Sequence, residues 1–211
     1  ATTEIYTLSL HDALPISVEE LVEIGADTFI RVGSSGSMQP YVHGGDVAIV
    51  TGAIRDEGTT LHYLPVEYPA VADIDVVCAL REAAKRLGMR HHLGVSQSKE
   101  SFYGEVERTR MPMPGRLKER WDSFVTAGAI CSEMESSALF ILSSIYRKRA
   151  GGAMLVINEH ELGETEAGAE DKQLPEFDAD AVIRVAVEAI KILIRSEERR
   201  VGKVCRSRWS P

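Results

Sequence analysis

The sequence has 211 residues, 44% of them hydrophobic and 27% charged, and its 32 acidic side chains outnumber the 24 basic ones to give a formal net charge of −8. A chain of this length can bury a substantial core as one domain. Its acidic balance is poorly suited to a protein that coats nucleic acid or an anionic membrane. No uninterrupted apolar stretch is long enough to cross a bilayer, and residues 1–16 lack the basic start and long apolar run of a signal peptide. We therefore expect a cytoplasmic protein in which Cys78 and Cys131, each within an apolar run, are buried reduced thiols.

The two ends of the chain do not resemble sequence selected to fold. Ala1–Ile16 ends in Ala-Leu-Pro-Ile, which the bases GCTCTTCCGATC encode, and Arg195–Glu198 is encoded by AGATCGGAAGAG. These two DNA strings are reverse complements over their overlap, and extending them reproduces nearly all of residues 1–16 and 195–211. We therefore interpret both ends as translated sequencing adapter, rather than the second as a basic arm for nucleic acid. The natural domain is then expected to occupy residues 17–194.

Helical and strand patterns alternate between these ends, which predicts a layered α/β domain. Ser17 is a suitable N-cap for the first helix, and Gly25 can end it. The helix over 73–87 is amphipathic, with an inner face predicted to contain Ile74, Val77, Cys78, Leu80, Ala84 and Leu87. In chain order, the predicted elements are a helix over 17–25, strands over 28–32 and 46–51, an ordered loop over 52–70, the helix over 73–87, a strand over 92–96, a loop over 99–115, a short helix through Trp121, a strand end over 129–131, a helix over 134–146, a strand over 152–158 and a helix over 179–194.

A glycine-serine turn is predicted at Gly33-Ser34-Ser35-Gly36, directly after the strand over 28–32. Such a turn leaves backbone N–H groups and hydroxyls free, and Arg31 beside it adds a forked cation suited to phosphate. The string matches neither the phosphate-loop nor the dinucleotide fingerprint, so an ordinary tight turn remains the alternative.

The string Glu133-Met134-Glu135 places two carboxylates where a short apolar strand runs into an apolar helix. At a strand end the two carboxylates would share a face, because side chains alternate with period two. Carboxylates are costly to bury, so sugar hydroxyls would be suitable partners for them. The alternative is that they are acids that merely favour a helix N-terminus.

Short motifs within residues 17–194 resemble one known family in their order and approximate spacing. They are RVGSSG, GDVAIVTGA, LHYLP, SFYG, RMPM and SEMESSALF, and the family is that of the nucleoside phosphorylases. The resemblance implies a three-layer α/β/α fold with a mixed central sheet, and phosphorolysis of uridine to uracil and ribose 1-phosphate. Inorganic phosphate would be the co-substrate, with no cofactor and no metal.

The resemblance also implies how the sugar and the phosphate are held. Met134 would pack on the ribose, while Glu135, with Glu133 close by, would hold the 2′ and 3′ hydroxyls. The phosphate nucleophile would be bound by Arg31 and Ser34, with Ser35 lining the same site.

At the base end, Phe102 would lie along the pyrimidine, and an arginine in the following loop would hydrogen-bond its carbonyl edge. Arg110 is our choice for that catalytic role, and Arg108 is the alternative. Relatives carry a glutamine after the Phe-Tyr-Gly string to read the uracil edge, whereas this chain has Glu105. A carboxylate can accept from N3–H but cannot donate to a carbonyl, so strict uracil preference is in question if Glu105 faces the base.

Two departures keep other functions open. Purine-specific members carry an aspartate after the last strand, where this chain reads Ile157-Asn158-Glu159, so a purine nucleoside phosphorylase or a related nucleosidase is the alternative enzyme. The family's N-terminal segment, which adds an arginine to the phosphate site and lends residues across a dimer interface, does not precede residue 17. We therefore expect part of a phosphorolytic enzyme whose full-length form is a dimer-based hexamer, with little or no turnover from this chain by itself. The alternative of another class is a non-catalytic nucleoside-binding fragment.

Overall fold

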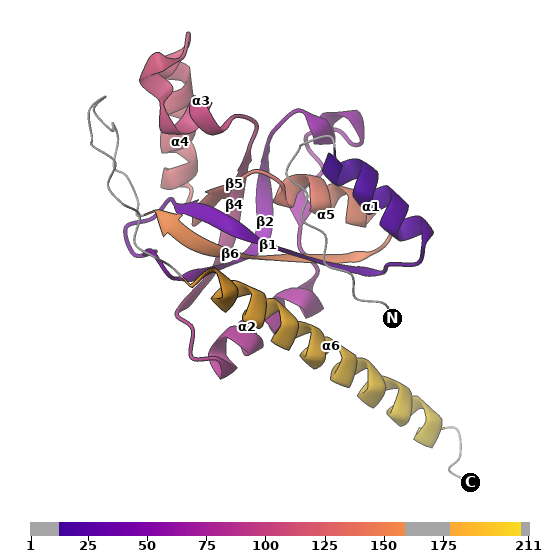
Figure 1. Cartoon of the computed structure of the whole chain (residues 1–211). Coiled ribbons are helices and arrows are strands. Elements are labelled where there is room, and N and C mark those ends of the chain that lie inside the picture. The colour runs from indigo at the N-terminus through magenta and orange to yellow at the C-terminus, as the bar shows by residue number, and fades with distance from the viewer. Residues whose placement is uncertain (1–12, 159–177, 208–211) are drawn as a thin grey trace.

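The computed structural model describes residues 13–158 and 178–207, with side chains described up to residue 198 (Figure 1). Its helices and strands are interspersed along the chain. They are α1 (Ala13–Glu23), β1 (Thr28–Ser37), β2 (Val47–Asp56), the 3-10 helix η1 (Thr59–His62), β3 (Ala70–Val71), α2 (Ile74–Arg86), β4 (His91–Lys99), α3 (Phe102–Val106), the 3-10 helix η2 (Arg108–Arg110), α4 (Pro114–Thr126), β5 (Cys131–Glu133), α5 (Ser136–Ile145), β6 (Arg149–Asn158) and α6 (Ala179–Ser207).

The strands form one mixed sheet in the order β3-β2-β4-β5-β1-β6, and an additional pairing of β2 with β6 curls the sheet back on itself. The pairs β1/β6, β2/β4 and β4/β5 are parallel, whereas β1/β5, β2/β3 and β2/β6 are antiparallel. This order brings the ends of β4, β5, β1 and β6 together, although they come from distant parts of the sequence.

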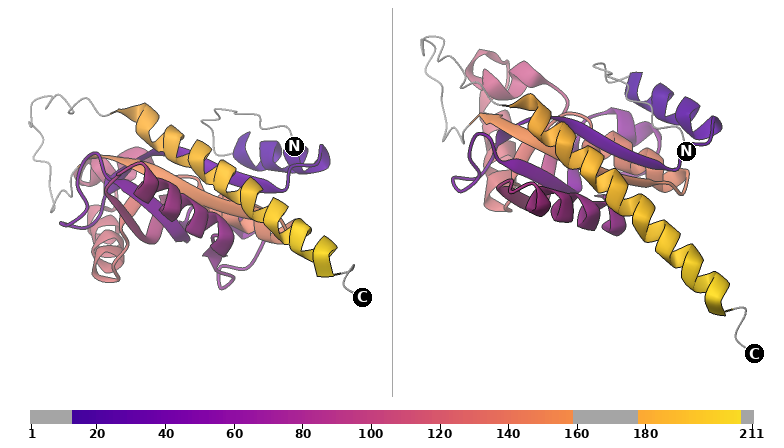
Figure 2. Two further views of the ribbon diagram at one scale, coloured as in Figure 1. Left: turned by 90° about the horizontal axis from the view of Figure 1, so that it is seen from below. Right: turned by 60° about the horizontal axis from the view of Figure 1, so that its bottom comes forward.

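Helices cover both faces of the sheet, with α1 and α5 on one side and α2 and α6 on the other (Figures 1 and 2). Because strand side chains alternate, β2 serves both cores: Ala48 and Val50 pack in the core with α5, and Val47 and Ile49 pack in the core with α2 and α6. The predicted three-layer fold with a mixed central sheet is confirmed. Among the described residues, no helix is both long and apolar enough to span a bilayer.

The turn predicted at residues 33–36 is wrong, because β1 continues through it. Ser34, Ser35 and Gly36 pair with β6, with a register shift between Ser35 and Gly36, and Gly36 also pairs with Ser132 of β5. Strand pairing on both sides therefore overrides the local preference of glycine and serine for a turn.

Other boundaries also differ from the predicted ones. The expected loop over 52–70 contains the end of β2 and η1, and the expected loop over 99–115 contains α3 and η2. The first helix begins at Ala13 rather than Ser17, with Pro15 in its first turn, where a missing N–H costs no helical hydrogen bond. Helix α6 continues beyond Ile194 to Ser207. The adapter origin of the two ends stays a prediction.

Helix α2 forms as predicted, and it buries part of the predicted face, including Val77, Leu80 and Ala84. Its N-cap, Asp73, accepts a hydrogen bond from the Val76 N–H at 3.0 Å. The predicted inner-face residues Ile74, Cys78 and Leu87 are exposed. The residues that α2 buries are Val76, Val77, Ala79, Leu80, Ala83 and Ala84. Of the two cysteines expected to be buried, only Cys131 is.

The close approach of α2 to the sheet explains which face is buried. A Cβ atom placed on Gly151 of β6 would lie 2.4 Å from Cγ1 of Val76, so only glycine leaves room for this contact. The hydrophobic pattern of α2 alone does not contain this constraint, because the partner strand lies far away in sequence.

Candidate active site

A cavity of about 450 Å³ opens where β1, β4, β5 and β6 end beside α3, η2 and α4. It is lined by every predicted site residue except Arg110, and these residues come from segments more than a hundred positions apart. They are Arg31, Ser34, Ser35, Phe102, Glu105, Arg108, Glu133, Met134 and Glu135.

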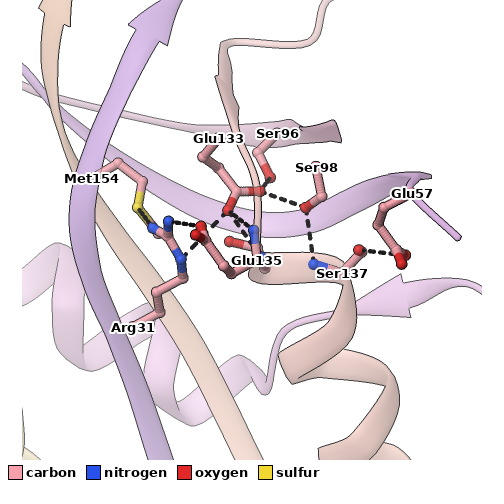
Figure 3. Close-up of polar contacts among 9 residues, drawn as sticks. Arg31, Glu57, Ser96, Ser98, Glu133, Glu135, Ser137 and Met154 are labelled. Carbon is pink, nitrogen blue, oxygen red and sulfur yellow. Dashed lines mark hydrogen bonds and ion pairs between the residues drawn. The ribbon is translucent and has the colours of Figure 1, made fainter. Parts of the chain in front are cut away.

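Glu133, at the end of β5, is the buried centre of the cavity wall (Figure 3). Its Oε1 accepts hydrogen bonds from the hydroxyls of Ser96 at 3.1 Å and Ser98 at 2.5 Å, and its Oε2 accepts from the N–H groups of Glu135 and Ser136, both at 2.8 Å. Glu133 therefore caps the start of α5 and fixes the position of Glu135. Because both of its oxygens are occupied, Glu133 suits a positioning role better than direct contact with sugar hydroxyls.

Arg31 projects from β1 to both carboxylates of the string at 133–135 (Figure 3). Its Nη2 contacts Glu135 Oε2, its Nε lies 3.5 Å from Glu133 Oε2, and its Nη1 contacts the Met154 sulfur. Burial by itself would lower the pKa of Arg31, but the two carboxylates outweigh burial and raise that pKa above its ordinary value. The guanidinium is thus a permanent cation that joins the predicted phosphate residues to the predicted ribose residues.

The two serines of β1 lie on the cavity with different exposure. Ser34 is exposed, whereas Ser35 is 4% exposed. Because this stretch pairs with β5 and β6, its backbone groups serve the sheet and are not the free N–H groups that the predicted turn would have offered. Anion binding at β1 would therefore depend on the guanidinium of Arg31 and on side-chain hydroxyls.

The two candidate arginines at the base end are separated by the structure. Arg108 lines the cavity, where its Nε donates to the backbone oxygen of Glu105 at 2.8 Å and its guanidinium lies 4.9 Å from the Trp121 ring centroid. Arg110 lies outside the cavity, pairs with Glu107, and has a side chain that is 66% exposed. The structure therefore favours Arg108 over Arg110 at the base end, because η2 leaves Arg108 and not Arg110 in the cavity. The catalytic role itself stays a prediction.

Phe102 and Glu105 both lie where the base was predicted to bind. Phe102 is half exposed on the cavity, and the Lys99 ammonium lies 5.4 Å from its ring centroid. Glu105 Oε1 accepts a hydrogen bond from the Ser132 hydroxyl at 2.7 Å. The sequence analysis missed Lys99, Ser132 and Trp121 as parts of this wall. The position of Lys99, at the end of a strand directly before the Ser-Phe-Tyr-Gly motif, was the signal that could have marked it.

Asn158 ends β6 at the cavity, at the position compared above with the aspartate of purine-specific enzymes. Its Oδ1 is buried and has no hydrogen-bond partner among the described residues. Glu159, the neighbouring acid, lies outside the described residues. No group of three or more histidine, cysteine, aspartate or glutamate side chains that could hold a metal ion occurs in the described part of the chain.

Comparisons with known proteins show the family of the chain. A sequence profile of the phosphorylase superfamily matches residues 12–196. A uridine phosphorylase of Treponema pallidum is 48% identical over 185 residues, which cover 88% of this chain and 70% of that protein. A uridine phosphorylase of Thermococcus kodakarensis is 42% identical, covering 89% of this chain and 66% of that protein. A guanosine phosphorylase of Halorubrum lacusprofundi is 34% identical, covering 84% of this chain and 70% of that protein. The chain belongs to the phosphorylase superfamily.

Proposed function

We propose that this chain catalyses the phosphorolysis of uridine to uracil and ribose 1-phosphate. The observation that carries the proposal is the single cavity in which Arg31 and the serines of β1 meet Glu135, while Phe102 and Arg108 line the same space. The two relatives with the higher identities reported above are named uridine phosphorylases, which supports uridine as the nucleoside.

The reaction suits this set of side chains. An oxygen of phosphate forms a bond to C1′ of the ribose as the C1′–N1 bond breaks, and the electron pair of the broken bond passes to the uracil ring. The proton of hydrogen phosphate ends on uracil, so no covalent nucleophile and no cofactor are required. The protein must place the phosphate and the sugar, and it must offer donors to the departing base, so positioning and electrostatics dominate.

Each wall of the cavity has a part in this scheme. Arg31 and Ser34 would bind the phosphate beside Ser35, and Glu135 would accept hydrogen bonds from the 2′ and 3′ hydroxyls above Met134. At the base end, Phe102 would lie along the ring and Arg108 would donate to a carbonyl oxygen. The Arg31–Glu135 contact supports this scheme, because it sets the anion site directly beside the sugar site.

The experiment is a panel of nucleosides assayed with and without phosphate on the purified 211-residue chain. The missing N-terminal segment led us to expect little or no turnover. Because the cavity brings together residues for phosphate, sugar and base, we propose instead that uracil is released from uridine, and only when phosphate is present. Release without phosphate would indicate a nucleosidase, and a preference for guanosine or inosine would favour the purine alternative, to which the guanosine phosphorylase relative points. Calorimetric binding of uridine with no turnover would support the non-catalytic fragment instead.

On the family resemblance alone, we further propose that the full-length protein works in cytoplasmic nucleoside salvage as a dimer-based hexamer. Sedimentation analysis at several protein concentrations tests the assembly: sedimentation as a hexamer would support it, and a protein that stays monomeric would contradict it.

A further inference from the structure

A lysine, a serine and a glutamate meet on the wall of the cavity beside Phe102. Lys99 Nζ donates to Ser132 Oγ at 3.1 Å and lies 3.4 Å from Glu105 Oε1, and the Ser132 hydroxyl donates to the same glutamate oxygen at 2.7 Å. The Lys99 and Glu105 side chains are only 10% and 11% exposed. An ammonium enclosed to this extent loses much of its hydration, and its ion pair with Glu105 offsets that desolvation cost.

The ammonium of Lys99 has hydrogen-bonding capacity left over. It carries three N–H donors, of which Ser132 and Glu105 take two. No third acceptor for Lys99 Nζ occurs among the residues that the structure describes. Its other neighbour is the ring of Phe102, with a distance of 5.4 Å from Nζ to the centroid, and both residues line the cavity, so the remaining donor can reach the space where the base is proposed to bind.

We infer that Lys99 and Glu105 together read the edge of uracil, with Lys99 donating to a carbonyl oxygen and Glu105 accepting from N3–H. This inference rests on the proposed function. In uracil, N3–H lies between two carbonyl groups, so a site that recognises this edge of the base needs a hydrogen-bond acceptor flanked by donors. Glu105 alone has no proton to donate, and Lys99 supplies the donor that a glutamine amide would have carried.

The Lys99–Glu105 pair would also select uridine over cytidine and stabilise the departing uracil. Cytosine presents an unprotonated N3, which would face the carboxylate oxygen without a hydrogen bond, so the pair selects against cytidine. As the C1′–N1 bond breaks, negative charge grows on the carbonyl oxygens of uracil. Lys99 keeps its proton throughout and stabilises that charge as a hydrogen-bond donor.

The central variant is Lys99→Met, which keeps the length of the side chain and removes its donors. We expect kcat/KM for uridine to fall about a hundredfold, the usual effect of removing one donor to a developing anion. A merely structural lysine could also cause a loss, because Lys99→Met leaves the Glu105 carboxylate unpaired. Two double variants separate these explanations.

Lys99→Met/Glu105→Gln replaces the charged pair by one amide that both donates and accepts, whereas Lys99→Met/Glu105→Met removes the charge without restoring a donor. We expect kcat/KM of the glutamine variant to be about tenfold higher than that of Lys99→Met, and kcat/KM of the methionine variant to be no higher. Equal recovery in both would show that Lys99 only balances the charge of Glu105, and would overturn the inference. Circular dichroism melts check that the two double variants, both neutral at this site, are folded alike.

Calorimetric binding of uracil gives a second readout, which does not need turnover. Lys99→Met should weaken uracil binding about tenfold, and the added Glu105→Gln should restore it. If the unmodified chain cleaves uridine and Lys99→Met cleaves it equally well, the inference fails while the proposed function stands. If the unmodified chain neither cleaves uridine nor binds uracil, the proposed function fails and the inference fails with it.

Discussion

At the scale of single residues, the site depends on which of two nearby arginines reaches the cavity. Arg108 lines it beside Trp121, whereas Arg110 pairs with Glu107 at the surface. We expect Arg108→Ala to lower kcat for uridine about a hundredfold, because a donor to the departing base is lost. Arg110→Ala is the matched control and should change kcat by less than about twofold. Steady-state rates that fall more for Arg110→Ala than for Arg108→Ala would contradict the placement.

A second residue-scale prediction concerns Gly33, which lies beside Arg31 on β1. A Cβ atom at Gly33 would lie 2.7 Å from Nη1 of Arg31, so Gly33→Ala must push the guanidinium away from Glu135. The side chain of Arg31 is flexible, so the fold should tolerate the change while the affinity for phosphate falls roughly tenfold, or about 1.4 kcal/mol.

The control for this prediction is Gly58→Ala, whose added Cβ would have only one neighbour, Glu100 Oε2 at 3.9 Å, an ordinary contact. The KM for phosphate and the melting temperature should be measured for both variants. An unchanged KM in Gly33→Ala would show that the position of Arg31 does not control phosphate binding.

At the scale of elements, Glu133 joins β4, β5 and α5. It accepts hydrogen bonds from two serine hydroxyls of β4 and from two backbone N–H groups at the start of α5. A second carboxylate, that of Glu57, accepts from the Ser137 hydroxyl at 2.8 Å (Figure 3). It also accepts from the N–H of Thr60 at 2.9 Å, which ties η1 to the same helix. The first turn of α5 is therefore held by carboxylates from two other segments.

Removing Glu133 should cost far more stability than removing its neighbour Glu135. In Glu133→Ala, two N–H groups, two hydroxyls and part of the Arg31 charge lose their partner in a buried setting, so we expect the free energy of unfolding to fall by about 3 to 5 kcal/mol. The side chain of Glu135 is 26% exposed, and Glu135→Ala should cost about 1 kcal/mol. Urea denaturation monitored by circular dichroism compares the two, and similar losses would contradict the role given to Glu133.

The elements also show what sequence can and cannot predict here. The helix over 73–87 was predictable because its N-cap and amphipathic spacing are local features. The extension of β1 through Gly33-Ser34-Ser35-Gly36 was not, because it is imposed by pairing with β5 and β6. The same limit applies to the site: the motifs pointed to Arg31, Phe102 and Glu135, but the Lys99–Glu105 contact follows from how α3 folds back on β4 and β5.

At the scale of the whole molecule, the two hydrophobic cores lie on opposite faces of one curled sheet. The site lies at the ends of strands whose side chains pack in these cores. A separate polar cluster ties the start of β2 to the start of β4. Asp46, which is 1% exposed, accepts hydrogen bonds from the His43 N–H and from His92 Nε2, both at 2.9 Å, and pairs with Arg90. This cluster holds the two long parallel strands in register at the edge where they begin.

The final prediction is that Asp46 makes the stability of the whole fold depend on acid pH. Burial would raise the pKa of Asp46, but the hydrogen bond from His43, followed by those from Arg90 and His92, outweighs burial and lowers that pKa below the ordinary value of 3.8. Because the pKa is lower in the folded state, the stabilisation is fully present above pH 3.8 and is lost as the pH falls through the folded-state pKa. Asp46→Asn should therefore lower the free energy of unfolding at pH 7 by about 2 kcal/mol and flatten its fall below pH 4. Urea titrations between pH 2 and pH 7 measure both effects, and equal acid slopes for the two proteins would show that Asp46 does not carry this dependence.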